Sequence, residues 1–188
     1  MKTAPGRPSA ADLRAAVGKS IPDVIASRLD VLFCGINPGL YSAATGCHFA
    51  RPGNRFWPAL FASGLTPRRL QPWERNELLV CKIGVTNLVR RATVSADELS
   101  VDELRAGARR LARKVARWRP RAVAVVGIGA YRVAFARPRA AIGRQPEGMS
   151  GAIVWVLPNT SGLNANHQAA DFAREFRRLF VAVRAASG

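Results

Sequence analysis

The sequence predicts an α/β protein: a single three-layer α/β/α domain with a central, mainly parallel sheet. Three short apolar runs rich in β-branched residues, 31–36, 121–127 and 153–157, have the composition of strands buried on both faces. Segments with helical spacing separate them, and this alternation is typical of a parallel sheet covered on both sides. With 188 residues, 48% of them apolar, the chain is long enough to bury a sizeable core.

The first strand ends abruptly at Asn37-Pro38-Gly39, three residues that stop a strand and turn the backbone. A polar segment, 41–55, follows it and contains Phe49 and a second turn at 52–54. Ligands of α/β sheets bind at the carboxyl ends of strands, so Asn37 would stand at the mouth of a site whose far wall could include Phe49. The alternative, which this stretch taken alone favours, is that Asn37 only caps a turn.

The remaining elements are predicted from caps and apolar spacing. Two capping boxes, Ser95 with Glu98 and Ser100 with Glu103, predict the start of the longest helix, which should end near Trp118. The other expected segments are helices at 54–64, 72–80, 127–136 and 167–183, a short strand or extended loop at 84–89, and a second polar loop at 158–164.

Four arginines recur every four residues along the longest helix: Arg105, Arg109, Arg113 and Arg117. Like charges at this spacing repel, so the row lowers helix stability unless anions screen it. A solvated helix face is the simplest interpretation of the row.

The formal net charge of +17 and the pI of about 11.6 suggest a polyanionic partner, with nucleic acid as the first candidate. The alternative is the codon bias of a GC-rich genome. No apolar run is long enough for a membrane span, and the N-terminus lacks a signal-peptide core, so we expect a cytoplasmic, nucleoid-associated protein. We expect residues 1–20 to form a flexible, basic, at most partly helical segment, and residues 21–188 to form the functional domain.

Few residues are suited to metal binding or acid–base catalysis. Three cysteines and two histidines, without metal-site spacing, predict no metal: Cys34, Cys47, Cys81, His48 and His167. Neither polar loop holds a Ser–His–Asp set, a Cys–His pair or two carboxylates, so any chemistry must rely on an amide, hydroxyls and backbone dipoles. Gly127 and Gly129 resemble the start of a dinucleotide loop, but Arg132 replaces its third glycine.

Two motifs carry a resemblance to a known family. Residues 35–39 (Gly-Ile-Asn-Pro-Gly) with 48–57 (His-Phe-Ala-Arg-Pro-Gly-Asn-Arg-Phe-Trp) resemble the first motif of the mismatch-specific uracil/thymine DNA glycosylases, one branch of the uracil-DNA glycosylase superfamily. Residues 159–163 (Asn-Thr-Ser-Gly-Leu) are similar to the second motif, a loop inserted into DNA. The resemblance spans roughly 30–182 and implies a uracil-DNA glycosylase-like fold.

The resemblance implies roles for single residues. Asn37 would position the water that attacks the anomeric carbon, and Phe49 would stack on the flipped base. The backbone at Ile36 would read the base edge, and amides of the turn that includes Gly39 would hold the departing pyrimidine. Ser42 would lie beside the carbon that carries thymine's methyl group, where thymine-acting members tend to have alanine. The other implied base-binding positions are His48, Asn87 and Thr93.

The second motif would supply a wedge that fills the stack vacated by the flipped base. Its implied members are Asn159, Ser161, Gly162, Leu163 and Asn164. Three positions depart from the family pattern: Thr160, where proline is usual, Asn164, and Ala165, where arginine is frequent.

We therefore expect a monofunctional DNA glycosylase that hydrolyses the N-glycosidic bond of uracil in mismatched double-stranded DNA, with thymine and ethenocytosine as further candidate bases. It would act as a monomer without a cofactor, and would pass its abasic product to downstream repair enzymes. One alternative is a DNA-binding repair factor on the same fold with little turnover. Another, resting on Gly127 and Gly129, is a Rossmann-like nucleotide-binding protein.

Overall fold

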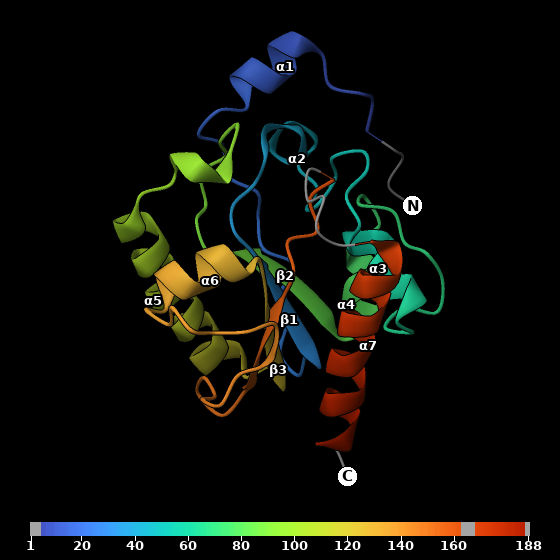
Figure 1. Cartoon of the computed structure of the whole chain (residues 1–188). Coiled ribbons are helices and arrows are strands. Elements are labelled where there is room, and N and C mark those ends of the chain that lie inside the picture. Colours follow the sequence, from blue (N-terminus) through green and yellow to red (C-terminus); the bar gives the residue numbers. More distant parts are fainter. Residues whose placement is uncertain (1–4, 163–167, 187–188) are drawn as a thin grey trace.

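A computed structural model of the protein describes residues 5–162 and 168–186. Its centre is a five-stranded sheet in the order β2-β1-β3-β5-β4 (Figure 1). The strands are β1 (Val31–Gly35), β2 (Ile83–Asn87), β3 (Ala122–Val126), β4 (Gly143–Arg144) and β5 (Ile153–Leu157). All neighbouring pairs are parallel except β4 with β5. The predicted single α/β domain with a mainly parallel sheet is confirmed.

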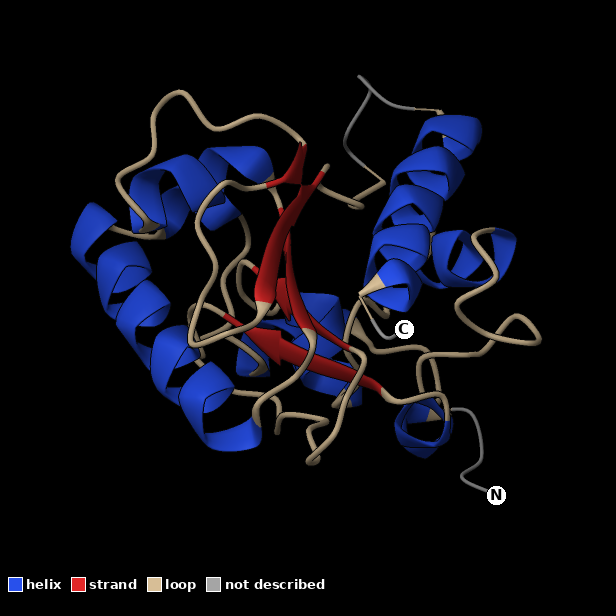
Figure 2. Cartoon of the chain, turned by 90° about the horizontal axis from the view of Figure 1, so that it is seen from below, coloured by secondary structure: helices blue, strands red, loops and turns tan. Residues whose placement is uncertain are grey.

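Helices cover both faces of the sheet (Figures 1 and 2). One face carries α3 (Phe56–Ala62), α4 (Arg75–Val80) and α7 (Ala169–Ala185), and the other carries α5 (Val101–Trp118) and α6 (Ile128–Ala134). Because side chains alternate along a strand, Val31 and Phe33 of β1 enter the α3/α7 core, whereas Leu32 and Cys34 enter the α5/α6 core. Every residue of β1 is buried, as predicted.

Local sequence signals place most helix ends correctly. Both predicted capping boxes form, at the short 3₁₀ helix η1 (Ala96–Glu98) and at the start of α5. Apolar residues of α5 face the core as expected, whereas Trp118 is only half-buried. Helix α4 begins at Arg75 rather than at 72, because residues 71–74 form a turn closed by the Glu74 carboxylate.

The segment predicted as a polar loop at 41–55 begins instead with a helix, α2 (Leu40–Thr45). Gly39, in an extended conformation, precedes it, and Gly46 ends it with a left-handed φ of 67°. A further helix, α1 (Ala10–Ala15), lies beside α2 (Figure 1), and Ala16 packs against Ala43 and Ala92. The boundary expected at residue 20 stays a prediction. No helix in the described ranges is long and apolar enough to cross a membrane.

Helix α5 approaches the segment after β2 unusually closely. A Cβ added at Gly107 would lie 2.6 Å from the carbonyl oxygen of Leu88 and 2.9 Å from its carbonyl carbon. Leu88 is completely buried, so neither backbone can retreat without disturbing the core. The lack of a side chain at Gly107 therefore fixes the position of the segment that follows Leu88.

This contact gives a test against helix propensity. Alanine is favoured over glycine in a helix by about 1 kcal/mol, so Gly107→Ala would stabilise a solvent-facing helix. Here we expect a net loss of about 1–3 kcal/mol in the free energy of unfolding, measured with urea, because the methyl group overpacks against Leu88. The control is Gly129→Ala in α6, where an added Cβ has no atom within 4 Å. A stabilised Gly107→Ala protein would contradict the proposed close approach.

Candidate active site

The candidate site lies at the carboxyl end of β1, close to the edge of the sheet where α2 lies (Figure 1). The backbone leaves the sheet at Gly35, passes Ile36 and Asn37, and enters α2 after Gly39. The carbonyl of Ile36 accepts a hydrogen bond from the N–H of Val89 at 2.9 Å. The segment after β2 therefore runs alongside the segment after β1, and both deliver side chains to the same place.

Asn37 is held by the segment after β2 in one orientation. Its Nδ2 donates to the carbonyl oxygen of Arg91 at 3.1 Å and to Oγ1 of Thr93 at 2.7 Å. A backbone carbonyl can only accept, so the atom facing Arg91 must be the amide nitrogen. Thr93 Oγ1 donates its proton to the carbonyl of Ser95 at 2.6 Å and must accept from Asn37.

The other end of the Asn37 amide is therefore an oxygen whose position is determined. No hydrogen bond reaches Oδ1 from residues 5–162 or 168–186. Thr93 is buried, and its N–H donates to the carbonyl of Pro38 at 3.2 Å. The amide is fixed through its Nδ2, and its Oδ1 stays available to a ligand or a water molecule.

His48 and Asn87 form a second hydrogen-bond chain of determined direction. Nε2 of His48 contacts the carbonyl oxygen of Pro22 at 3.0 Å and must donate to it, because that oxygen can only accept. His48 is 5% exposed, and burial lowers its pKa, so the ring is neutral and its Nδ1 is an acceptor. Nδ1 accepts from Nδ2 of Asn87 at 3.3 Å, which leaves Oδ1 of Asn87 directed elsewhere.

Gly35 is the point where Asn87 and Phe49 meet. A Cβ built there would collide with Oδ1 of Asn87 and lie 3.2 Å from Cζ of Phe49. The Phe49 ring stacks on Phe56, with centroids 4.1 Å apart and planes 19° apart. One face of the Phe49 ring is thus covered by Phe56, and one edge lies on Gly35. The opposite face is the one that could stack against a flat ligand.

Ser42 holds the backbone beside Phe49. Its Oγ accepts from the N–H of Ala50 at 3.1 Å, and its side chain is buried. Phe49 has a φ of 53°, a left-handed conformation that a bulky residue rarely adopts. The Ser42 hydrogen bond directly follows this strained residue and helps to keep it there.

The second loop follows β5 and packs against the turn at 52–55. The N–H of Arg55 donates to the carbonyl of Thr160 at 2.9 Å, and its guanidinium donates to the carbonyl of Ser161. Oδ1 of Asn159 accepts from the N–H of Ser161 at 3.0 Å, and the Cα of Gly162 lies against the backbone of Gly53. Leu163, Asn164 and Ala165 lie outside the described residues.

Thr160 is buried, and its Oγ1 has no hydrogen-bond partner among the described residues. An apolar side chain would therefore lose no hydrogen bond at this position.

Several residues of the site carry no sequence signal. Arg91 and Pro22 act through their carbonyl oxygens, which every residue possesses, and Gly35 acts through the absence of a side chain. Arg55 lies in the quoted first motif, but nothing in the sequence places it under the second loop. A glycine at the end of a buried strand was the one signal that could have indicated Gly35.

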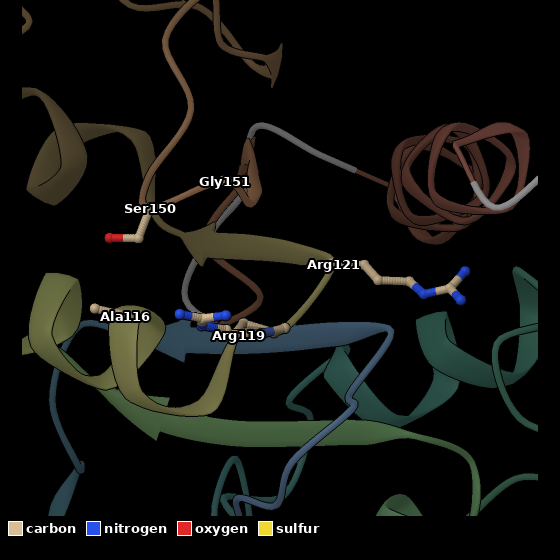
Figure 3. A pocket seen from close by; sticks show the side chains of 6 residues that line it. Ala116, Arg119, Arg121, Ser150 and Gly151 are labelled. Carbon is tan, nitrogen blue, oxygen red and sulfur yellow. The ribbon is translucent and has the colours of Figure 1, made fainter.

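The amino edge of the sheet carries a separate cavity of about 400 Å³, lined by Ala116, Arg119, Pro120, Arg121, Ser150 and Gly151 (Figure 3). In Figure 3 the side chain of Arg121 points away from Arg119 and Ser150. Because these residues precede β3 and β5 whereas Asn37 follows β1, the cavity is not part of the candidate site. Within the described chain, no group of three or more His, Cys, Asp or Glu residues could hold a metal ion.

The fold and this site define a class: α/β proteins whose ligand site lies at the carboxyl edge of a mainly parallel sheet. Residues 22–183 match the uracil DNA glycosylase superfamily, and the chain belongs to it. Its members are DNA glycosylases. A solved structure with the same fold is the solution NMR structure of a candidate uracil DNA glycosylase from Methanosarcina acetivorans. The two chains are 20% identical, the TM-score is 0.53, and the match covers 87% of this chain and 99% of that one.

His48 should make stability depend on pH. Because burial lowers its pKa below the ordinary value of 6.5, the unfolded chain binds a proton at a higher pH than the folded protein. Above about pH 6.5, His48 should not lower the free energy of unfolding. As the pH falls below this value, the free energy of unfolding should decrease.

The measurement is urea unfolding of the parent and of His48→Gln at several pH values between about 5 and 8. All other titratable groups are common to both proteins, so their contributions cancel. The parent should lose more stability than the variant on acidification. Equal losses would show that His48 is not held neutral.

Proposed function

We propose that the protein is a monofunctional DNA glycosylase of the mismatch-specific uracil/thymine branch, which removes uracil from mismatched double-stranded DNA. The observation that carries this proposal is the Asn37 amide, fixed by Arg91 and Thr93 with its Oδ1 left available. It also rests on membership of the superfamily and on the residues that resemble the branch. The protein would act as a monomer without a cofactor, and the abasic product would pass to downstream repair enzymes.

The chemistry would follow from the properties of an amide. Oδ1 of Asn37 would accept a hydrogen bond from a water molecule and aim the oxygen of that water at the anomeric carbon. An amide oxygen is a poor base, so it would not deprotonate the water before the glycosidic bond breaks. Bond breaking would therefore run ahead of attack, through an oxocarbenium-like state, and the pyrimidine would leave as an anion. Backbone amides of the turn that includes Gly39 would stabilise the departing anion.

Recognition of the base would use the second chain of hydrogen bonds. A duplex hides the glycosidic bond, so the nucleotide must be flipped out, at a cost of a few kcal/mol. The face of Phe49 opposite Phe56 would stack on the flipped ring. Because His48 takes the amide nitrogen of Asn87, Asn87 would accept a hydrogen bond from the base through Oδ1, the atom that lies beside Gly35. Uracil and thymine carry an N3–H donor, whereas cytosine has an acceptor at N3, so this arrangement favours the first two.

The turn at 52–55 would hold the wedge loop in place. Gly162 packs against Gly53, and Arg55 donates hydrogen bonds to the carbonyls of Thr160 and Ser161. Asn159 accepts a hydrogen bond from the N–H of Ser161 within the loop. The remaining proposed members, Leu163 and Asn164, would follow directly from this anchored part and enter the stack vacated by the flipped base.

The direct test of Asn37 uses single-turnover excision of uracil from a duplex in which it lies opposite guanine. Asn37→Ala should reduce excision by about 10²-fold or more, because the water loses its orientation. Thr93→Val removes one of the two bonds that fix the amide, and should reduce excision by roughly 5-fold, since one hydrogen bond contributes about 1 kcal/mol.

Both variants should bind a duplex with an abasic site as the parent does. Near-normal excision by Asn37→Ala would overturn the proposed mechanism. A parent that binds this duplex but excises no base would indicate the alternative, a DNA-binding repair factor.

The preference for uracil over thymine is proposed to depend on Ser42. Thymine adds one methyl group, and overpacking a rigid site costs about 1–3 kcal/mol, or roughly 5- to 150-fold in rate. Ser42→Ala provides space but also removes the hydrogen bond to Ala50, so it should slow excision of both bases somewhat. The ratio of the thymine rate to the uracil rate should nevertheless rise. An unchanged ratio in single-turnover assays would remove Ser42 from the proposal.

A further inference from the structure

A cavity of about 460 Å³ lies on the β2 side of the molecule, between residues 21–25 and α5. Residues 21–25 follow the edge strand, because Val24 and Val85 form an antiparallel bridge. Five cationic side chains and one half-buried indole line the cavity: Arg90, Arg110, Arg113, Lys114, Arg117 and Trp118. We call this set the basic cavity.

Carboxylates do not balance the charge of the basic cavity. Asp23 also lines it, but Asp23 pairs with Lys114 at 2.6 Å and accepts from Thr86 at 2.7 Å. In the part of the chain that the structure describes, no carboxylate lies within salt-bridge distance of Arg90, Arg113 or Arg117.

Some arginines elsewhere on the protein have carboxylate partners on their own helix, whereas Arg105 and Arg109 of α5, like Arg113 and Arg117, have none among the described residues. On α7, Arg174 bonds Asp171 at 2.7 Å, and Arg178 bonds Glu175 at 3.0 Å. Several cations at the spacing of one helix turn repel one another, so α5 would be more stable with an anion bound across them. What distinguishes the cavity side of α5 is that Arg110, Arg113 and Arg117 gather there around one hollow, which favours an anionic ligand at that place.

The geometry of α5 divides its arginine row into two pairs. Successive residues four apart in a helix are rotated by about 40° around the helix axis relative to one another, so a row at this spacing winds gradually around the helix surface. Arg113 and Arg117 line the basic cavity, whereas Arg105 and Arg109 have drifted away from it and are exposed on the same helix. The two pairs carry equal charge and differ in their place relative to the cavity.

The basic cavity begins beside the candidate active site and leads away from it. Arg90 precedes Arg91, whose carbonyl fixes Asn37. Arg117 and Trp118 end α5 just before β3 and so lie towards the opposite, amino edge of the sheet. From Arg110 to Arg117 the helix rises about 10 Å, which is long enough to face more than one phosphate of a strand. A duplex seated over the carboxyl edge would not run down this side of the molecule.

We propose that the basic cavity binds the sugar–phosphate backbone of a second DNA segment while the active site holds the first. Guanidinium groups spaced along a helix suit successive phosphates of a polymer better than the converging contacts that one small anion requires. The guanidinium of Arg117 lies 5.1 Å from the centre of the Trp118 ring, and an indole beside such cations can stack with an unpaired base. The second segment is therefore single-stranded where it crosses Trp118. This proposal adds a second site to the proposed function.

The test measures second-segment binding separately from excision. The protein is first saturated with a short, unlabelled duplex containing an abasic site, and a labelled, undamaged single strand is then titrated while its fluorescence anisotropy is followed. The parent should bind the labelled strand with an affinity that falls as salt rises. Arg113→Gln with Arg117→Gln should weaken this binding about 10-fold and reduce the slope of log affinity against log salt by about 1.4, since each arginine contacts one phosphate of a single strand.

The matched control is Arg105→Gln with Arg109→Gln, which removes the same charge from the same helix. It should change the binding of the labelled strand by less than about 2-fold. Excision of uracil from a short duplex should be unchanged in both double variants. Equal loss in the two variants would show diffuse attraction by the net charge and would overturn the proposal.

Two other outcomes would also overturn it. One is that the parent binds no second strand. The other is that inorganic triphosphate displaces the strand at equal phosphate concentration, which would assign the cavity to a small anion. A failed excision assay would leave the binding result intact, so the two proposals can fail separately.

Discussion

The candidate site depends on one constraint: the orientation of the Asn37 amide against the carbonyl of Arg91. Thr93, which gives its own proton to Ser95, accepts from the same amide nitrogen, so the amide presents its oxygen and not its NH₂ group. The constraint lies in backbone outside β1, so the segment after β2 must be placed accurately beside the segment after β1. Three devices achieve this: the parallel register that sets Gly35 opposite Asn87, the close approach of Gly107 to Leu88, and the ion pair of Arg91 with Glu103. The Arg91 guanidinium beside Glu103 lowers the pKa of that carboxyl to about 2, so the pair persists in mild acid.

The two amides of the site are fixed by the same physical means. Each hydrogen-bond chain ends on a backbone carbonyl, Arg91 or Ser95 for Asn37 and Pro22 for Asn87. Because a carbonyl can only accept, the direction of every bond before it is determined. Both amides consequently present oxygen, and neither chain contains a group that is charged at neutral pH. The site offers two acceptors in fixed positions and no strong base.

The fold was largely predictable because its signals are local. Buried strands, capping boxes and the long amphipathic α5 each follow from a few adjacent residues. Helix α2 was missed because six residues between two glycines show no apolar period. Residues 35–39 and 48–57 resemble a known motif, and this resemblance indicated Asn37 and Phe49 as site residues. The residues that contact these two side chains could not be predicted. Pro22 and Arg91 contribute carbonyl oxygens, and their proximity to His48 and Asn37 is decided only when distant segments pack together.

The absence of carboxylates from the site fits the charge of the molecule. The chain has twelve acidic residues and twenty-nine lysines and arginines. Several of the acidic residues form helix caps or ion pairs, such as Asp12, Asp23 and Glu103. No carboxylate hydrogen-bonds to Asn37 or Thr93 within the described chain. In the proposed mechanism a carboxylate there would be a stronger base than the amide, but it would also repel the pyrimidine that leaves as an anion and the phosphates on either side of it. A neutral amide avoids both repulsions but cannot drive the attack. In the proposed mechanism the rate would then depend on how well the base carries negative charge, so the site would select a leaving group by its acidity as well as by its shape.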